Sequence, residues 1–420
     1  MNTETKRITI LGGFHQGFHW FSVGLLIPVI TLLQLEKGLD LIQVGVASAA
    51  YSITVLILEL PTGSLADTIG RKRIYILSRI FQLLTGALLF TAGGFPLVMA
   101  GFIAMGISRA LSSGSMDAYF IDALEMAGRG MDLQKPLAIM GMFAPAGLAA
   151  GSLLGGRLPM TLGAVLVRYG ISDRFGANIA VAVVCTILQV IFTLLVVREE
   201  SLPVAARSAN RDNGFGSVLA GGLKQALTSK PLLILLSATL AWGIAFSGLE
   251  RFWQPRVKTI LGNPENTMIF GLLSTGYFGV GVIGNLMSIP LSKWLGNNHG
   301  RTMVILRILM GGFFILLYRA SGIGGFSVFY LGAFLVNGIS NSPHAAMFNK
   351  IVPSGKRATI LSLESLFLQA GGALGALYSG FVAESLSIGH TWLIGGVVLM
   401  VSSLLYIPFR NVNKVREVAA

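Results

Sequence analysis

The sequence has 420 residues, of which 53% are hydrophobic and only 12% are charged, whereas soluble domains carry about a quarter charged residues. So few charged side chains exclude an ordinary soluble fold of this length and predict an integral membrane protein. The single cysteine, Cys185, excludes a disulfide within the chain, and the net charge of +13 follows a pattern described below.

Twelve apolar segments are long enough to cross a membrane, which takes about 20 mostly apolar residues. They run over 8–34, 41–66, 73–94, 96–124, 136–160, 175–197, 231–253, 267–292, 302–320, 325–348, 358–383 and 389–409. Long unbroken runs of this kind differ from the short alternating segments of an outer-membrane barrel. The first segment is too long for a signal peptide, and no small-residue cleavage site follows it. The sequence therefore predicts an all-α integral membrane protein with 12 transmembrane helices.

Lysine and arginine are distributed unevenly between the two sides of these spans. With the N-terminus inside, 20 of them fall on the cytoplasmic side and 8 on the opposite side. The remaining three, Arg79, Arg109 and Arg307, fall within spans. This bias predicts a multi-pass protein of the cell (inner or plasma) membrane with both termini cytoplasmic. It also explains the net charge, so no nucleic-acid partner is expected.

The longest polar connection lies at 198–230, between the sixth and seventh spans. It predicts an N-terminal six-helix bundle over 1–197, a central cytoplasmic loop with an interfacial helix over 198–230, and a C-terminal six-helix bundle over 231–420. Two halves of similar length joined by such a loop are typical of secondary transporters. We expect a monomer in the lipid bilayer.

The loop after the second span carries the most specific motif. Residues 63–73 read GSLADTIGRKR. This resembles the signature of the major facilitator superfamily between its second and third helices. The resemblance implies two pseudo-symmetric six-helix bundles that rock about a central cavity, and a contact between these bundles that locks one state. The lock residues on this interpretation are Gly63, Asp67, Gly70, Arg71 and, as the partner of Arg71, Asp122.

Two further segments are similar to parts of that superfamily. Arg109 followed by Gly114 resembles its fourth-span motif, and the glycine-rich stretch 141–156 resembles the fifth span of proton-linked exporters. Segments 59–63 and 357–365 look like parts of bacterial drug-efflux members. Ordinary packing of small residues between helices would also explain 141–156.

Ionisable side chains within the spans are candidates for proton coupling, because a charge in the bilayer is costly. We assign this role to Asp117, Glu59 and Arg109; an ion pair of Asp117 with Arg109 or Arg79 is the structural alternative. On a continuous helix, Asp117 would lie about 12 Å along and 80° around from Arg109.

Candidate substrate-binding groups are polar or aromatic residues within spans that would face a cavity. They are Glu250, His19, Gln16, Tyr119, Trp242, Phe246, Asn337 and Asn341. His344 and Asn349 share the tenth span with the two asparagines, and Glu364 would pair with a basic residue. Packing in lipid-facing helices and interfacial charges are the structural alternatives.

Enzyme chemistry finds little support. The G-x-G-x-x-G match at 279–284 lies inside a membrane helix instead of following a strand, and no P-loop sequence occurs. His15 and His19 have a spacing that permits a metal, but no H-E-x-x-H pattern accompanies them. We expect no cofactor, no metal and no enzymatic activity.

These features predict a secondary active transporter. The main hypothesis is proton-coupled antiport, with efflux of a small amphipathic or cationic compound such as a drug. The alternative is proton-coupled uptake of a metabolite such as a sugar or siderophore; a cavity rich in Asn and Gln would favour it, whereas carboxylates and aromatic rings favour drugs. A membrane enzyme and a non-transporting scaffold are the rivals from other classes.

Overall fold

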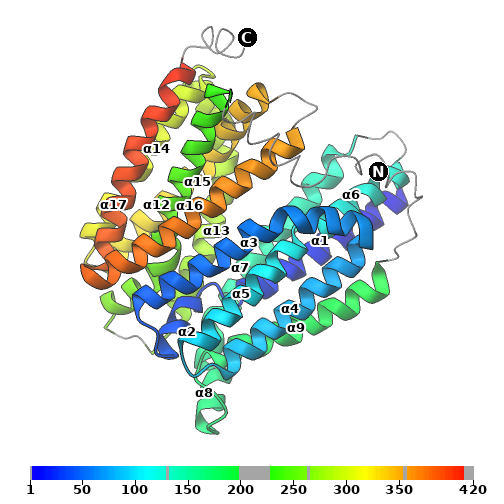
Figure 1. Ribbon diagram of the computed structural model, residues 1–420, viewed down its shortest axis with the longest axis vertical. Helices are drawn as coiled ribbons and strands as arrows, with labels where there is room; N and C mark the ends of the chain where they lie inside the picture. Colours follow the sequence, from blue (N-terminus) through cyan, green and yellow to red (C-terminus); the bar gives the residue numbers. More distant parts are fainter. Residues whose placement is uncertain (1, 129–131, 198–227, 263–264, 353–356, 411–420) are drawn as a thin grey trace. The chain divides into compact units, whose positions relative to one another are not determined.

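The computed structural model describes residues 2–128, 132–197, 228–262, 265–352 and 357–410 (Figure 1). Within these ranges the chain is helical throughout, with short connections and no strand. The predicted central loop and its interfacial helix fall almost entirely outside the described residues.

The helices of the first half of the chain follow one another with short connections. They are α1 (Thr3–Gly24), α2 (Ile30–Glu36), α3 (Leu41–Ile69), α4 (Arg71–Thr91), α5 (Phe95–Ser112), α6 (Ser115–Gly128), α7 (Gln134–Arg157), the 3-10 turn η1 (Leu158–Met160), α8 (Leu162–Arg168) and α9 (Gly176–Val196).

The helices of the second half are longer on average. They are α12 (Lys230–Ile260), α13 (Met268–Trp294), α14 (His299–Arg319), α15 (Ile323–Ile351), α16 (Arg357–Ser385), α17 (Ile388–Ser402) and the 3-10 segment η3 (Ser403–Arg410).

Eleven helical segments of the described chain are long and apolar enough to cross a membrane. The prediction of an all-α multi-pass membrane protein is therefore confirmed, whereas the count of 12 is not. The difference lies in the first predicted span, 8–34, which is divided between α1 and α2. α1 is not among the eleven because it carries polar side chains such as His15, Gln16 and His19.

The chain forms two compact units. Unit 1 comprises 1–39, 57–212 and 264–276, and unit 2 comprises 40–56, 213–263 and 277–420. α3 and α13 are thus each shared between the units. In unit 2, the backbone N–H of Leu41 at the start of α3 donates to Oε2 of Glu384 at 3.0 Å. In unit 1, Thr275 of α13 donates to the carbonyl of Ala149 at 3.0 Å.

Both units use the same packing pattern. In unit 1, α1 packs against α7, and α4 packs against α5 and α9. In unit 2, α12 packs against α16, and α14 packs against α15 and α17. The first, third, fourth, fifth and sixth spans of each half therefore occupy equivalent positions within their own unit, as a pseudo-symmetric pair of six-helix bundles requires.

The glycine-rich stretch of α7 packs directly on α1. A Cβ atom on Gly151 would collide with the backbone of Phe21 and Gly24, so the two helix backbones approach closely here. The G-x-G-x-x-G match likewise lies within α13, where Gly284 faces the backbone of Leu335 on α15. The helix-packing interpretation of this match is confirmed.

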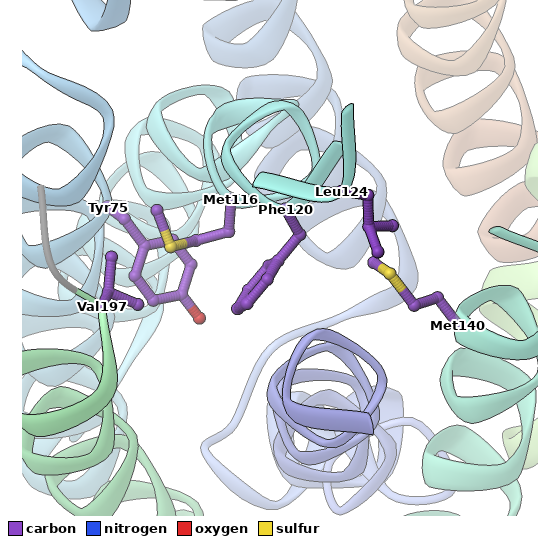
Figure 2. Packing of buried hydrophobic residues seen from close by; sticks show 6 residues of the cluster. All are labelled: Tyr75, Met116, Phe120, Leu124, Met140 and Val197. Atoms are coloured by element: carbon purple, nitrogen blue, oxygen red, sulfur yellow. The ribbon is translucent and has the colours of Figure 1, made fainter. Parts of the chain in front are cut away.

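A buried hydrophobic cluster lies beside α6 in unit 1 and includes Tyr75, whose hydroxyl contacts a polar residue (Figure 2). Its members are Tyr75, Met116, Phe120, Leu124, Met140 and Val197. The ring of Phe120 lies against Gly12 of α1, where any larger residue would collide with it. Tyr75 is only 2% exposed, so its hydroxyl is held inside the unit, where it contacts His19.

Candidate functional site

Unit 2 contains a cavity of about 300 Å³ within its membrane-spanning helices. The walls come from α12, α14, α15 and α16. The polar groups on these walls are Thr239, Trp242, Arg307, Asn337, Ser340, Asn341, His344, Asn349 and Glu364. Such a concentration of hydrogen-bonding groups inside an apolar bundle is typical of a ligand site.

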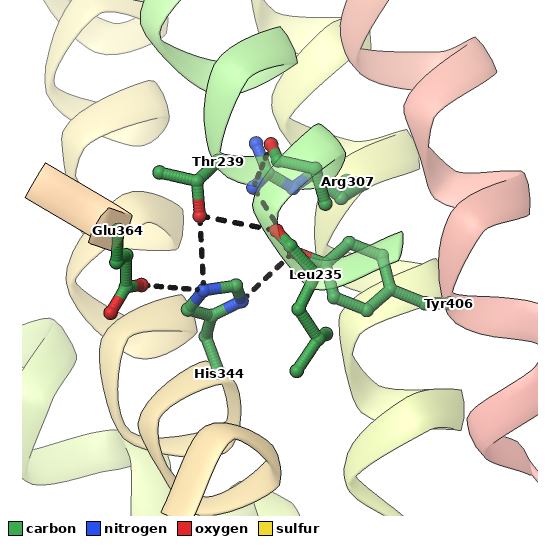
Figure 3. A network of polar contacts seen from close by, with 7 residues as sticks. Leu235, Thr239, Arg307, His344, Glu364 and Tyr406 are labelled. Carbon is green, nitrogen blue, oxygen red and sulfur yellow. Dashed lines mark hydrogen bonds and ion pairs between the residues drawn. The ribbon is translucent and has the colours of Figure 1, made fainter. Parts of the chain in front are cut away.

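His344 is the centre of the polar network on this wall (Figure 3). Its Nε2 lies 3.0 Å from Oε1 of Glu364 and 3.3 Å from Oγ1 of Thr239. Its Nδ1 lies 3.0 Å from the hydroxyl of Tyr406. That hydroxyl is also 3.2 Å from Nη2 of Arg307. The network thus joins α12, α14, α15, α16 and η3.

The direction of each hydrogen bond follows from the donors available. A guanidinium only donates, so Arg307 donates to the oxygen of Tyr406, and Tyr406 donates its own proton to Nδ1 of His344. The ring proton of His344 is thereby assigned to Nε2, from which it is donated to Glu364. The hydroxyl of Thr239, whose proton goes to a backbone carbonyl, also accepts at this side. The hydrogen bonds therefore run in one direction, from Arg307 through Tyr406 and His344 to the carboxylate of Glu364.

Arg307 is 4% exposed, yet only part of its guanidinium is satisfied. Nη2 donates to the carbonyl of Ala238 at 3.4 Å and to Tyr406. Nε and Nη1 have no hydrogen-bond partner among the described residues. A buried cation with unsatisfied donors is costly, and this one lies on the cavity wall.

An aromatic surface adjoins the polar network. Nε1 of Trp242 donates to Oδ1 of Asn337 at 2.9 Å, and its ring stacks on Phe246 with centroids 4.6 Å apart. Phe246 contacts Phe314 at 5.2 Å in turn. Of the predicted substrate-binding residues, the structure thus brings together Trp242, Asn337 and Asn341 on the cavity, with Phe246 supporting Trp242 from behind.

Unit 1 has a comparable cluster around Arg79 of α4, in which each guanidinium nitrogen has a hydrogen-bond partner. Nη1 donates to Nδ1 of His19 at 3.0 Å, Nε to Ser78 at 3.1 Å and Nη2 to Ser108 at 3.5 Å. The guanidinium carbon lies 4.9 Å from the centre of the Tyr75 ring. The predicted substrate-binding residue His19 therefore binds Arg79 within its own unit.

Asp117 is placed differently from the expectation of one continuous helix. Ser113 and Gly114 interrupt the fourth predicted span, and Gly114 adopts a φ of 71°, which favours glycine. The assumption of one continuous helix from Arg109 to Asp117 is therefore wrong. Asp117 is exposed and accepts a hydrogen bond of 3.2 Å from Nε2 of Gln16.

The other predicted proton-coupling and substrate-binding residues are dispersed. Arg109 lies 5.9 Å from the ring centre of Trp20, and Tyr119 contacts a neighbouring phenylalanine ring. Glu59 is half-buried on α3, and Glu250 is exposed on α12.

Arg71 and Asp122, the predicted lock partners, are in contact. Nη1 of Arg71 lies 2.5 Å from Oδ2 of Asp122. Gly70 precedes α4 with a φ of 113°, a conformation that only glycine adopts easily. Gly63 and Asp67 fall on α3 at positions whose side chains lie outside the described part.

Tyr406 is the member of the polar network that sequence reasoning missed, and Arg307 was not among the candidate site residues. The signal that could have identified Arg307 was its position, which matches that of Arg79 in the other half of the chain. Arg79 lies eight residues after the start of α4 and Arg307 eight residues after the start of α14, and both helices have 21 residues. A charged residue at the same position of two repeated spans indicates a role in each unit.

The fold and the polar cavity define a multi-pass membrane transporter. The family model of the Major Facilitator Superfamily matches residues 13–343, and the chain belongs to this superfamily. Its members are transporters, so the chain is a transporter of a small molecule and not an enzyme, as the sequence predicted.

Relatives and solved structures agree with this assignment. The chain is 22% identical to the uncharacterized MFS-type transporter YxaM of Bacillus subtilis (strain 168), over 92% of each protein. It resembles the crystal structure of the nucleoside transporter NupG with a TM-score of 0.76 and 14% identity, over 97% of this chain and 99% of that one. It also resembles a bacterial homolog of the human lysosomal transporter Spinster, with a TM-score of 0.74 and 12% identity over 99% of each chain. At these identities the solved structures support the fold alone.

Proposed function

We propose that the chain is a proton-coupled secondary transporter that binds one small polar solute in the cavity of unit 2. The observation that carries this proposal is the contact between His344 and Glu364 at 3.0 Å on the cavity wall. The two side chains are 16% and 24% exposed, and both line the cavity. An ionisable pair within membrane-spanning helices is a candidate for proton movement.

Coupling requires that proton binding and solute binding influence each other. The pair meets this requirement by position, because Glu364 and His344 line the same cavity in which a solute would lie.

The cavity lining favours uptake of a metabolite with hydrogen-bonding groups. Asn337, Ser340 and Asn341 present amides and a hydroxyl, and Trp242 presents a flat ring. These groups suit a solute with a ring and several hydroxyl or amide groups. NupG, which the fold resembles, is described as a nucleoside transporter, and nucleosides have this chemistry.

A second candidate is antiport with efflux of an amphipathic or cationic compound. Asp117 favours it, because this exposed carboxylate on α6 accepts from Gln16 and would bind either a proton or a cation. Glu59 and Arg109 would assist coupling, and Glu250 would bind the cation. On this second candidate function, the chain would export drugs.

The remaining features of the proposal concern the membrane. We place the monomer in the cell (inner or plasma) membrane with both termini cytoplasmic, according to the distribution of basic residues. Gly63, Asp67, Gly70 and the Arg71–Asp122 pair would lock one of the two alternating states.

Purified protein in liposomes that enclose a pH-sensitive dye tests the proposal. Uptake of nucleosides, sugars and cationic dyes is followed together with proton movement. Glu364→Gln removes coupled proton movement and Asp117→Asn preserves it if the cavity of unit 2 carries the proton; the reverse result supports the second candidate. Glu36→Gln, at an exposed carboxylate of α2, is the control. Proton movement that survives both cavity and α6 variants contradicts both candidates.

A further inference from the structure

The amide of Asn337 has a fixed orientation on the cavity wall of unit 2. Nε1 of Trp242 lies 2.9 Å from Oδ1 of Asn337, and an indole N–H can only donate. The oxygen is therefore the amide atom that faces Trp242, without the ambiguity that usually affects amide groups. Nδ2 of Asn337 has no hydrogen-bond partner among the described residues, and it is accessible instead of sealed in the wall. Asn337 thus needs a hydrogen-bond acceptor on the solute.

Asn341 lies one helical turn further along α15 and lines the same cavity. The residue is exposed, and its amide makes no hydrogen bond to the described part of the chain. Side chains four residues apart on a helix are separated by about 5–6 Å at Cβ, so one small ring can contact both asparagines. Asn341 therefore offers a donor and an acceptor beside the donor of Asn337.

A planar ring edge with alternating acceptors and donors complements these two amides. An asparagine binds an adjacent donor and acceptor on a flat ring through two parallel hydrogen bonds. A cyclic imide has a ring N–H between two carbonyl groups, so Asn341 would bind the N–H and one carbonyl, and Nδ2 of Asn337 the other carbonyl. The cavity volume of about 300 Å³ is at the lower end for ligand sites and suits a single ring of this kind beside Trp242.

We propose that the solute bound in unit 2 carries a planar cyclic imide, and that Asn337 and Asn341 determine this specificity. This inference rests on the proposed function and names the substrate class of the same cavity. The hydrogen atom on the imide nitrogen is the feature that the solute must keep, because it is the only donor that the imide edge offers to Oδ1 of Asn341.

Binding to the purified full-length protein in detergent tests this specificity without a transport step. The probes are uracil, uridine and glutarimide, each paired with its analogue methylated at the imide nitrogen. Xylose and benzylamine represent a sugar and an amphipathic cation. Thermal stabilisation and titration calorimetry report binding. We expect methylation to lower the affinity about tenfold or more, because the paired hydrogen bonds to Asn341 are lost.

Variants test the two asparagines separately. Asn341→Leu has a similar size but no hydrogen-bonding atoms, so it should bind each imide and its methylated analogue equally. Asn341→Gln keeps the amide and should retain part of the preference. Asn337→Asp keeps an acceptor for Trp242 but loses the donor, so it should weaken every imide while methylation still lowers the affinity. Asn266→Ala removes an exposed amide that accepts from the backbone of Met268 away from the cavity, and is the control.

The proposal is overturned if the methylated analogues bind as tightly as their parents, if xylose or benzylamine binds more tightly than every imide, or if no imide binds. A methylation effect that persists in Asn341→Leu overturns the role of that residue; if this variant does not fold, the series on the unchanged protein still decides. Selective imide binding by a protein that moves no protons contradicts only the proposed function. Proton-coupled uptake of a solute without an imide contradicts only this inference.

Discussion

Arg79 and Arg307 stand at equivalent positions of the two units, and their surroundings differ. Both are nearly buried, with 3% and 4% of their surface exposed. Arg79 has a hydrogen-bond partner for each guanidinium nitrogen, whereas Arg307 has partners for one nitrogen only among the described residues. The same residue in the same fold position is therefore satisfied at every nitrogen in one unit and keeps two buried nitrogens without a partner among the described residues of the other.

The difference follows from what the neighbouring helices contribute. In unit 1, His19 of α1 and Ser108 of α5 both turn toward Arg79. In unit 2, Arg307 lies on a cavity wall, and His344 is bonded to Glu364 and Tyr406 instead of to Arg307. The two units thus keep the arginine at the same position but differ in the partners around it.

The largest expected effect is on coupled transport. With a pH difference of one unit and no membrane potential, co-transport of one proton with a neutral solute concentrates the solute about tenfold, since one pH unit corresponds to about 1.4 kcal/mol. Glu364→Gln should reduce this accumulation to equality, because the proton site is lost. Radiolabelled solute in liposomes measures the ratio, and Asp117→Asn should leave it near tenfold. Accumulation by the Glu364 variant would refute the assignment of the proton to unit 2.

The second effect is on stability. Arg79→Met removes the three hydrogen bonds to His19, Ser78 and Ser108, at about 0.5–1.5 kcal/mol each, although Nδ1 of His19 keeps its contact with the hydroxyl of Tyr75. Arg307→Met removes the two hydrogen bonds of Nη2, to Ala238 and Tyr406, together with two buried donors that have no partner among the described residues, so it should cost about 2 kcal/mol less. Thermal unfolding of both variants in the same detergent checks this order. Equal losses would mean that the two arginines have equivalent roles.

A smaller effect is expected at the aromatic surface. Trp242→Phe keeps a flat ring but removes the 2.9 Å hydrogen bond to Asn337, a loss of about 1 kcal/mol or about fivefold in solute affinity. Titration of a nucleoside that the liposome assay identifies as a solute measures it. Trp20→Phe in unit 1 should have no effect, and a comparable loss there would place the solute elsewhere.

The smallest effect is expected for the Arg71–Asp122 pair. Its side chains are 20% and 37% exposed, and exposed ion pairs contribute about 0–1 kcal/mol. Asp122→Asn should therefore change the unfolding temperature little. If the pair locks one transport state, the same variant alters transport rates at unchanged stability; a loss of stability alone would contradict that role.

The fold class was predictable because hydropathy and the position of the GSLADTIGRKR motif depend only on local sequence. Asp117 shows the limit of this reasoning. Its place relative to Arg109 depends on a break at Ser113 and Gly114, and a glycine in an apolar segment is compatible with both a continuous and an interrupted helix.

The cavity was predicted only in part. Trp242, Asn337 and Asn341 were candidates because polar groups within spans are costly, and the structure places them on one wall. The chain from Arg307 through Tyr406 to His344 was not predictable, because its members are 37 or more residues apart and meet only through the packing of α14, α15 and η3.

The sharing of α3 and α13 between the units has a consequence for folding. Neither half of the chain contains every segment of one unit, since unit 2 needs 40–56 and unit 1 needs 264–276. A fragment that ends after α9 lacks the α13 segment whose Thr267 bonds to Gly156 at 2.6 Å, and its counterpart lacks the α3 segment that covers Gly380. Neither half can therefore complete its packing alone, so the two fragments should resist proteolysis only when they are co-expressed.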